Sequence, residues 1–523
     1  MKNKYQVVIV GAGPVGLALA VDLGLRGVAC ALVESRTGSH RIPKGQNLTQ
    51  RTFEHFYFWG IVEELRAARV MPRGYPIGEI TAYGDLTGPY WHAPAGREMV
   101  RPFYFQDNDR LPQYCMEAVL RTKLGALRSV DTRFGWTARA VEQDAAGARV
   151  RIARDAEEAL LEADYVVGCD GPGSLVRRQA GIERGGTDFQ QPMALMVFRS
   201  RELHEGLKRF PERSTYRVMR ADLGGYWWFL GRIDVGEGWF FHAPVPPGAD
   251  AASFDFHGLV QRAAGFSFAW QVEHIGFWDL RVSIAEHYRR GRVLIAGDAA
   301  HSHPPYGGYG LNNGLEDAAN LGWKLQAALA GWGGDALLDA YDAERRPVFK
   351  SVGEDFIAAR IRRDAEFFAR HNPQRDRADF ERAWATLKDE SGTRVHGYEP
   401  NYEGSPAVAG PPGGVSSAHG EHAFKARAGH HLAPQPLSSG RNVFEELSRT
   451  SFNLLAFDAD AEPLDAAARK LGIPLKVIRD SFRDARTAYE SRLVLVRPDQ
   501  FVAWAGERAP EDPAALMRRL AGR

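Results

Sequence analysis

The sequence predicts an α/β protein in which a domain built on a parallel sheet is interrupted by an antiparallel sheet and followed by a second, smaller α/β domain. Three observations support this prediction. Strand and helix patterns alternate around a glycine turn over residues 5–34, short aromatic-rich strands occupy residues 216–245, and a strand, helix, strand and hairpin follow residue 451. A chain of 523 residues is long enough for about three domains.

The composition is that of an ordinary soluble protein and excludes several functions. Lys and Arg number 66 against 65 Asp and Glu, so no basic surface for nucleic acid or an anionic membrane is predicted. Cys30, Cys115 and Cys169 are too widely spaced for a disulfide framework or a cysteine-built metal site, and no metal is predicted. They favour a reducing compartment, and we expect a cytoplasmic location.

The apolar N-terminus could be mistaken for a signal peptide or a membrane span. Glycines and Pro14 interrupt it, and Asp22 follows. Their spacing has a better explanation, so we expect neither secretion nor membrane insertion.

A strand over residues 5–10 leads into a G-x-G-x-x-G turn, which is followed by a helix and by a second strand ending at Glu34. This order is that of the dinucleotide-binding βαβ unit. Gly11 permits the tight turn, Gly13 lets the backbone approach a pyrophosphate, and Gly16 lets the helix pack against the strand. Glu34 would accept hydrogen bonds from a ribose. The motif does not distinguish NAD from FAD.

Two further strands end in acidic motifs. The strand over 165–170 ends at Asp170-Gly171, which could also be a plain strand followed by a turn. The strand over 292–296 ends at Gly297-Asp298 and precedes a glycine-rich loop and a helix that opens near Leu311. Asp298 could accept hydrogen bonds from the ribityl hydroxyls of a flavin. The N–H groups at the helix start could stabilise negative charge on a reduced ring.

With these motifs, residues 5–350 resemble the class A FAD-dependent aromatic hydroxylases, the flavoprotein monooxygenases that include phenol hydroxylase and p-hydroxybenzoate hydroxylase. The match is most specific through GDAAH, PP, GG, GLN and DAANL in residues 297–321. The resemblance implies noncovalent FAD in a Rossmann-like domain, with cofactor-binding residues Gly11, Gly13, Gly16, Glu34, Arg41, Gln113, Asp170, Asp298, Gly310, Leu311 and Asn312. It also implies that the carbonyl of Pro305 contacts the oxygen adduct. Tyr309 stands where relatives more often carry Gln, which leaves the local hydrogen bonding and flavin mobility open.

The aromatic-rich segments at 216–218, 226–235 and 238–245 are expected to form an antiparallel sheet over the flavin. Tyr226, Trp228 and His242 are the candidate substrate residues, although each could equally belong to the core of the sheet. His301 and His303 are expected to be structural rather than catalytic.

After a Gly-, Pro- and Ser-rich stretch, the C-terminal elements resemble the thioredoxin-like tail of the phenol hydroxylase branch. They contain no cysteine, so we expect a structural or oligomerisation role without redox chemistry. The predicted division is an FAD-binding domain in two parts (1–185 and 286–395), a substrate sheet (186–285), a linker (396–440) and a thioredoxin-like domain (441–523).

The implied function is that of a single-component monooxygenase that hydroxylates a phenol or another activated aromatic ring through a flavin C4a-hydroperoxide. It would use FAD, NADH or NADPH, and O2, and its partners would be a small aromatic substrate and O2, without nucleic acid or membrane; a homodimer stays open. The chain lacks a second G-x-G-x-x-G and a C-x-x-C motif, which disfavours two-nucleotide and dithiol reductases. Ring-opening or Baeyer–Villiger-like oxygenation on the same fold, and a non-catalytic flavin-binding protein, remain alternatives.

Overall fold

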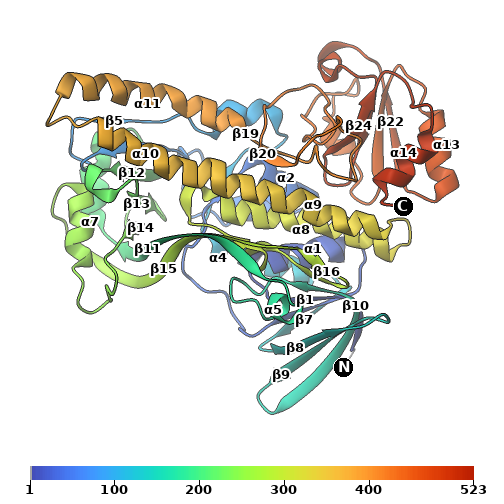
Figure 1. Ribbon diagram of the computed structural model, residues 1–523, viewed down its shortest axis with the longest axis horizontal. Helices are drawn as coiled ribbons and strands as arrows, with labels where there is room; N and C mark the ends of the chain where they lie inside the picture. The colour runs from blue at the N-terminus through green and yellow to red at the C-terminus, as the bar shows by residue number, and fades with distance from the viewer. Residues whose placement is uncertain (1–2) are drawn as a thin grey trace.

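A computed structural model describes residues 3–523 and contains two large sheets, a smaller C-terminal sheet and the helices that cover them (Figure 1). The first sheet has the order β16-β17-β10-β1-β2-β7, and β9, with β8 beside it, attaches to β10. Its strands are β1 (Lys4–Val10), β2 (Cys30–Glu34), β7 (Val130–Phe134), β8 (Thr137–Gln143), β9 (Ala148–Arg154), β10 (Glu157–Gly168), β16 (Arg289–Arg290) and β17 (Val293–Ile295). The central strands β17, β10, β1, β2 and β7 are parallel, so their carboxyl ends meet at one edge.

The predicted βαβ unit is confirmed by α1 (Pro14–Leu25), which connects β1 to β2. The helix starts directly after Gly13 with a proline in its first turn, where the missing N–H is not needed. Leu17, Ala18 and Leu19 are fully buried although successive side chains point about 100° apart around a helix. A helix that is apolar all round must be covered on several sides, and α4 (Gln113–Gly125) and α8 (Tyr309–Leu329) pack against it as well as the sheet.

The second sheet has the order β18-β15-β11-β14-β13-β12-β4-β5. Its strands are β4 (Glu79–Tyr83), β5 (Trp91–His92), β11 (Arg184–Arg199), β12 (Thr215–Met219), β13 (Trp227–Arg232), β14 (Gly238–Pro244), β15 (Gln271–Ala285) and β18 (His301–Ser302). The three predicted aromatic strands are confirmed as β12, β13 and β14. The predicted substrate sheet covered residues 186–285 only. In the structure β4 and β5, from residues 79–92, also belong to this sheet, and β4 pairs in parallel with β12. The division into domains remains a prediction.

Most of the helices lie over the two sheets. Besides α1, α4 and α8, the helices are α2 (Gln50–Trp59), α3 (Val62–Ala67), α5 (Leu175–Gln179), α6 (Arg201–Gly206), α7 (Phe256–Ala264), α9 (Asp335–Ser351), α10 (Ala359–Arg370), α11 (Arg377–Gly397), α12 (Val443–Glu446), α13 (Glu462–Leu471) and α14 (Pro513–Leu520). A π-helical turn, Val352–Ala358, joins α9 to α10. In Figure 1, α10 and α11 lie over the end of the second sheet that carries β12, and Met219 of β12 shares a buried cluster with Phe368 and Trp384. Among the described residues, no helix is both long enough and apolar enough to cross a bilayer.

The C-terminal sheet has the order β22-β21-β23-β24, with strands β21 (Phe452–Phe457), β22 (Leu475–Asp480), β23 (Leu493–Val496) and β24 (Val502–Gly506). It lies beside the end of α8 (Figure 1). The rings of Trp323 in α8 and Phe452 in β21 lie 6.0 Å apart in one buried cluster, so the sheet packs against this helix. Arg497 crosses the same contact and donates to Glu344 of α9 at 2.6 Å and to Asp499 at 2.6 Å. Lys324 of α8 also donates to Glu344 at 2.6 Å, and all these charged side chains are buried. The C-terminal domain is therefore held by a buried ionic contact in addition to an apolar one.

The segment predicted as a linker, 396–440, has little regular structure but is not a free tether. It contains only the short pair β19 (Tyr398–Asn401) and β20 (Ser417–His419). Tyr402 and Val408 are fully buried, and the ring of Tyr402 lies 4.1 Å from that of Phe501. Glycine and proline in this stretch produce tight turns, whereas its apolar side chains join it to the core.

Candidate functional site

A single cavity of about 1390 Å³ brings together the glycine turn, the G-D loop, the start of α8 and the cavity face of the second sheet. It opens at the carboxyl edge of the parallel strands, where ligands bind in open α/β sheets. A site for one drug-sized molecule needs roughly 300–1,000 Å³. The cavity is therefore large enough for a long cofactor together with a second molecule.

The three glycines of the turn have different surroundings. A Cβ on Gly16 would lie 1.9 Å from the carbonyl oxygen of Gly11, so only a glycine lets α1 pack this closely. Gly11 has φ +99°, and its Cβ would meet the backbone of Cys169. Gly13 faces the open cavity, and no heavy atom lies within 4 Å of its Cβ position. Gly11 and Gly13 line the cavity, whereas Gly16 lies behind them and shapes the turn.

Glu34 lies at the end of β2 and lines the same cavity. Its carboxylate accepts hydrogen bonds from the backbone N–H groups of Ala12 and Arg36, both at 2.9 Å. Burial raises the pKa of this carboxyl, but the hydrogen bonds outweigh that effect and lower the pKa below its usual value. Glu34 is therefore ionised at neutral pH and can accept hydrogen bonds from a sugar hydroxyl.

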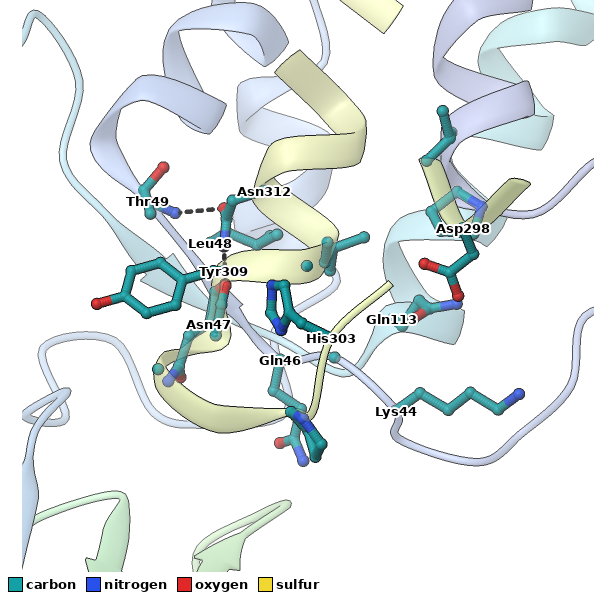
Figure 2. Close-up of a pocket in the computed structure, with 18 of the residues that line it drawn as sticks. Lys44, Gln46, Asn47, Leu48, Thr49, Gln113, Asp298, His303, Tyr309 and Asn312 are labelled. Atoms are coloured by element: carbon teal, nitrogen blue, oxygen red, sulfur yellow. Dashed lines mark hydrogen bonds between the residues drawn. The ribbon is translucent and has the colours of Figure 1, made fainter. Parts of the chain in front are cut away.

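Asp298 follows β17 and points into the cavity (Figure 2). In the part of the chain that the structure describes, no donor reaches its carboxylate within hydrogen-bond distance. Although the side chain is open to the cavity, protein surrounds it, and burial raises its pKa against the opposing charges of His301, Arg184 and Lys44. An acceptor that faces a cavity and has no donor among the described residues fits a ligand that carries hydroxyl groups.

The N-terminus of α8 forms the wall beside Asp298. Gly308 precedes the helix with φ +68°, a conformation that favours glycine. The side chain of Asn312 accepts from Thr49 N–H at 2.9 Å and donates to the carbonyl of Asn47 at 2.9 Å, which ties the helix to the segment before α2 (Figure 2). Because this amide is already bonded within the protein, the first-turn backbone N–H groups of α8 are the donors left for a ligand. Gly310, Leu311 and Pro305 also line the cavity.

Of the remaining predicted cofactor residues, Gln113 and Asp170 line the cavity and Arg41 does not. Gln113 lines the cavity and donates to Glu117 at 2.8 Å. Asp170 also lines it, but its carboxylate accepts from Ser174 at 2.5 Å and from the N–H of Leu175 at 2.7 Å, so it caps α5. Arg41 is exposed and does not line the cavity, unlike its neighbours His40 and Ile42.

The predicted substrate residues are corrected by the alternation of β13. Trp228 packs on the far face of the sheet, in the same buried cluster as Leu259 of α7, and does not line the cavity. Trp227 and Phe229 face the cavity instead. Tyr226 precedes the strand and also lies outside the cavity lining, whereas His242 of β14 lines it. The doublet Trp227-Trp228 shows that one ring faces each side, but sequence alone does not say which.

The two histidines after Asp298 also differ. His301 is buried and shares a 2.6 Å hydrogen bond with Asp317, which agrees with the structural role expected for it. His303 lines the cavity, donates from Nδ1 to the carbonyl of Pro304 at 2.5 Å and leaves Nε2 without a partner among the described residues. Burial lowers its pKa to about 4, and burial likewise lowers that of His242 to about 4, so both rings are neutral at pH 7. The spacing after Asp298 gave no sign that the two histidines would separate in this way.

Comparisons with known proteins agree with this geometry. The FAD binding domain family matches residues 4–236 and 247–355, and the aromatic-ring hydroxylase C-terminal family matches residues 425–523. A 4-methyl-5-nitrocatechol 5-monooxygenase of a Burkholderia species is 30% identical over 98% of this chain and 96% of its own length.

Two solved structures extend the likeness over the whole fold. The rebeccamycin biosynthetic enzyme RebC with reduced flavin has a TM-score of 0.84 and 27% identity over 99% of both chains. Aklavinone-11 hydroxylase with FAD and aklavinone has a TM-score of 0.83 and 25% identity over 100% of both chains.

Proposed function

Since the chain belongs to the family of FAD-dependent aromatic-ring hydroxylases, we propose that it hydroxylates a phenol or another activated aromatic ring with NAD(P)H and O2. One observation carries this proposal. A single cavity contains both a nucleotide-binding turn and an aromatic-lined sheet, so a cofactor and a ring-shaped substrate can lie in contact. We place the reaction in the cytoplasm, in keeping with the scarcity of cysteine.

The residues of the cavity fit FAD. The open space at Gly13 would admit the pyrophosphate, and the N-terminus of α1 would face it with free N–H groups. The ionised carboxylate of Glu34 would accept from the adenosine ribose, and the unpartnered carboxylate of Asp298 from the ribityl chain. The first-turn N–H groups of Gly310 and Leu311 would face the polar edge of the flavin ring.

Bound FAD supplies the redox chemistry: it takes a hydride from NAD(P)H and activates O2 for transfer of one oxygen atom. The chain's part is to bind the substrate, orient it and exclude water. Trp227 and Phe229 would hold an aromatic ring against the cavity face of the sheet. Pro305 lines the same space from the loop before α8.

The neutral histidines suggest how a hydroxyl group is oriented. His303 Nε2 has no hydrogen-bond partner among the described residues, and its Nδ1 donates to Pro304, so Nε2 is an acceptor in the neutral ring. We propose that His303 or His242 accepts the hydrogen bond of the substrate hydroxyl and so increases the electron density of the ring. Replacing either by Phe would then lower kcat with a substrate phenol more than it lowers FAD affinity.

The test is direct. The purified protein is expected to contain FAD, and a panel of phenols is screened for those that accelerate NADH or NADPH oxidation. Products are examined by mass spectrometry under ¹⁸O2, where one labelled oxygen in an intact ring is the expected result. A bound flavin with no aromatic product would contradict hydroxylation, and a labelled product with an opened or expanded ring would favour the alternative oxygenations.

A further inference from the structure

Part of the cavity lining consists of arginines that belong to the helices over the second sheet. Arg360 and Arg363 belong to α10, and Arg394 to α11; all three line the cavity. Arg217 of β12 is buried directly behind them. These four residues, called here the arginine cluster, come together because α10 and α11 lie over the β12 end of the second sheet (Figure 1).

Among the side chains that the structure describes, the carboxylates near the arginine cluster are too few to neutralise its positive charge. Asp364 pairs with Arg217 and lies 3.8 Å from Arg363, and Glu79 lies 3.8 Å from Arg360. Within the described residues, Arg394 has no carboxylate in ion-pair range. Among the side chains that the structure describes, four guanidinium groups therefore face two carboxylates, which leaves an excess of two positive charges.

Another carboxylate of the cavity lining, Asp355, belongs to the π-helical turn before α10, but it interacts with other residues. Asp355 accepts from the hydroxyl of Ser351 at 2.7 Å and lies 3.7 Å from His419. Arg97 lines the cavity as well and lies over the ring of Tyr398. When Asp355 and Arg97 are included, the described side chains around the arginine cluster still carry more positive than negative charge.

The arginine cluster also has unused hydrogen-bond donors. Arg360 Nε, Arg363 Nε and Arg363 Nη2 are buried and have no hydrogen-bond partner among the described residues, although Arg363 Nη2 lies 3.8 Å from Asp364. Burial, followed by the charges of Arg360, Arg363 and Arg217, lowers the pKa of Arg394 to about 9. Buried charges and unpaired donors are costly to a fold unless a ligand compensates them.

Two simpler explanations account for only part of the cluster. The ring of Trp227 lies 4.5 Å from the guanidinium carbon of Arg217 and 5.1 Å from that of Arg360, so cation–π contacts stabilise those two residues. They leave Arg363 and Arg394 unexplained. The pyrophosphate of FAD does not account for the cluster, because the glycine turn lies on the first sheet whereas the arginines lie on the second sheet and its helices.

Building on the proposed function, we propose that the aromatic substrate carries an anionic group, most simply a carboxylate, which binds between Arg363 and Arg394 with Arg360 beside it. Guanidinium groups suit this role because they offer paired N–H donors to a carboxylate. The ring would then extend from the arginine cluster towards Trp227 and Phe229. The cluster therefore determines specificity and orientation, not the oxygen transfer itself.

The experiment uses the FAD-loaded enzyme and a matched pair of probes, 6-hydroxy-2-naphthoate and its methyl ester. Binding is measured from the change in flavin absorbance, which does not require turnover. We expect the acid to bind about 10- to 100-fold more tightly than the ester, the range of a charged hydrogen bond. R394M should reduce this preference to threefold or less without changing the ester Kd, and R394K should retain part of it.

Two controls make the result specific. R362M removes an exposed arginine of α10, the helix that carries Arg360 and Arg363. Arg362 does not line the cavity, so this variant should keep the preference for the acid. The KM for NADPH should be the same in R394M and the unmodified enzyme. An R394M enzyme with a raised NADPH KM and an unchanged acid preference would assign the anion to the co-substrate and overturn the proposal.

The remaining outcomes also decide the question. An acid that binds no more tightly than the ester, including the case in which neither perturbs the flavin, overturns the proposal, as does a preference that survives in both R363M and R394M. If neutral phenols such as 2-naphthol are hydroxylated while the acid shows no advantage, only this inference fails. If the protein holds no FAD or no aromatic compound is hydroxylated, the proposed function fails too.

Discussion

Gly13 and Gly16 lie three residues apart in one turn, and the same substitution should have opposite effects at the two positions. Gly13 has φ −69° and ψ −177°, which any residue adopts, and its Cβ position is empty to 4 Å. Gly13→Val should therefore change the free energy of unfolding of the apoprotein by less than about 1 kcal/mol. A Cβ on Gly16 would lie 1.9 Å from the Gly11 carbonyl, a backbone atom. Gly16→Val should cost about 3 kcal/mol or more, because the turn and α1 must separate.

The effect on FAD is reversed. The valine methyl groups at Gly13 would occupy the space proposed for the pyrophosphate, so the backbone hydrogen bonds to it would be lost. Each charged hydrogen bond contributes about 1.5–3 kcal/mol. Loss of two of them gives about 3–6 kcal/mol, or a Kd for FAD raised by a factor of roughly 10²–10⁴.

The assay separates folding from binding. Stability is measured on apoprotein by urea denaturation, because a bound cofactor would distort a two-state analysis. FAD affinity is then measured by titrating the apoprotein and following flavin fluorescence. A folded Gly13→Val protein that binds FAD with unchanged affinity would refute the placement of the pyrophosphate. A stable Gly16→Val apoprotein would refute the packing of the turn.

The other predictions concern separate parts of the molecule. Asp298→Ala should weaken FAD binding by about 1.5–3 kcal/mol, measured by the same titration, and an unchanged Kd would mean that the ribityl chain lies elsewhere. Arg497→Met leaves Glu344 with one fewer partner in a buried cluster, so calorimetry should show a stability loss of about 3–5 kcal/mol; a loss under 1 kcal/mol would show that the C-terminal domain is held by apolar packing alone. Trp228→Ala should cost about 3–5 kcal/mol of stability, and a folded variant should keep the Kd of a phenolic ligand, because the ring packs away from the cavity. Anaerobic flavin reduction by NAD(P)H, measured by stopped flow, should be at least tenfold faster with substrate bound. Equal rates with continued hydroxylation would show that substrate binding does not control reduction. The ring of Tyr309 lies 4.7 Å from that of Tyr398, and this contact could prevent movement of the loop.

The order of the elements and a dinucleotide-binding turn could be predicted from the sequence because both depend on local patterns, whereas the choice of FAD rested on the family resemblance. A short apolar run, a glycine turn and a helix occupy consecutive residues, so β1, α1 and β2 follow from spacing alone. The strand that ends at Asp298 and the helix after it were predictable for the same reason, although the helix begins at Tyr309, slightly earlier than expected.

The face of a strand could not be predicted in this way. Trp227 and Trp228 are equally apolar neighbours, and only the helix that covers one side of the sheet decides which ring enters the cavity. The addition of β4 to β12 is also a long-range pairing with no local sign.

Charge shows the same limit most clearly. The whole chain is nearly neutral, with a formal charge of +1, and Arg217, Arg360 and Arg394 are far apart along it. The fold brings Arg360 and Arg394 into the lining of one cavity with Arg217 buried near them, and the described side chains include too few carboxylates to balance them. Secondary structure depends on neighbours in sequence, which can be read directly from the chain. A binding site depends on neighbours in space, and here only the packing of α10 and α11 on the second sheet creates them.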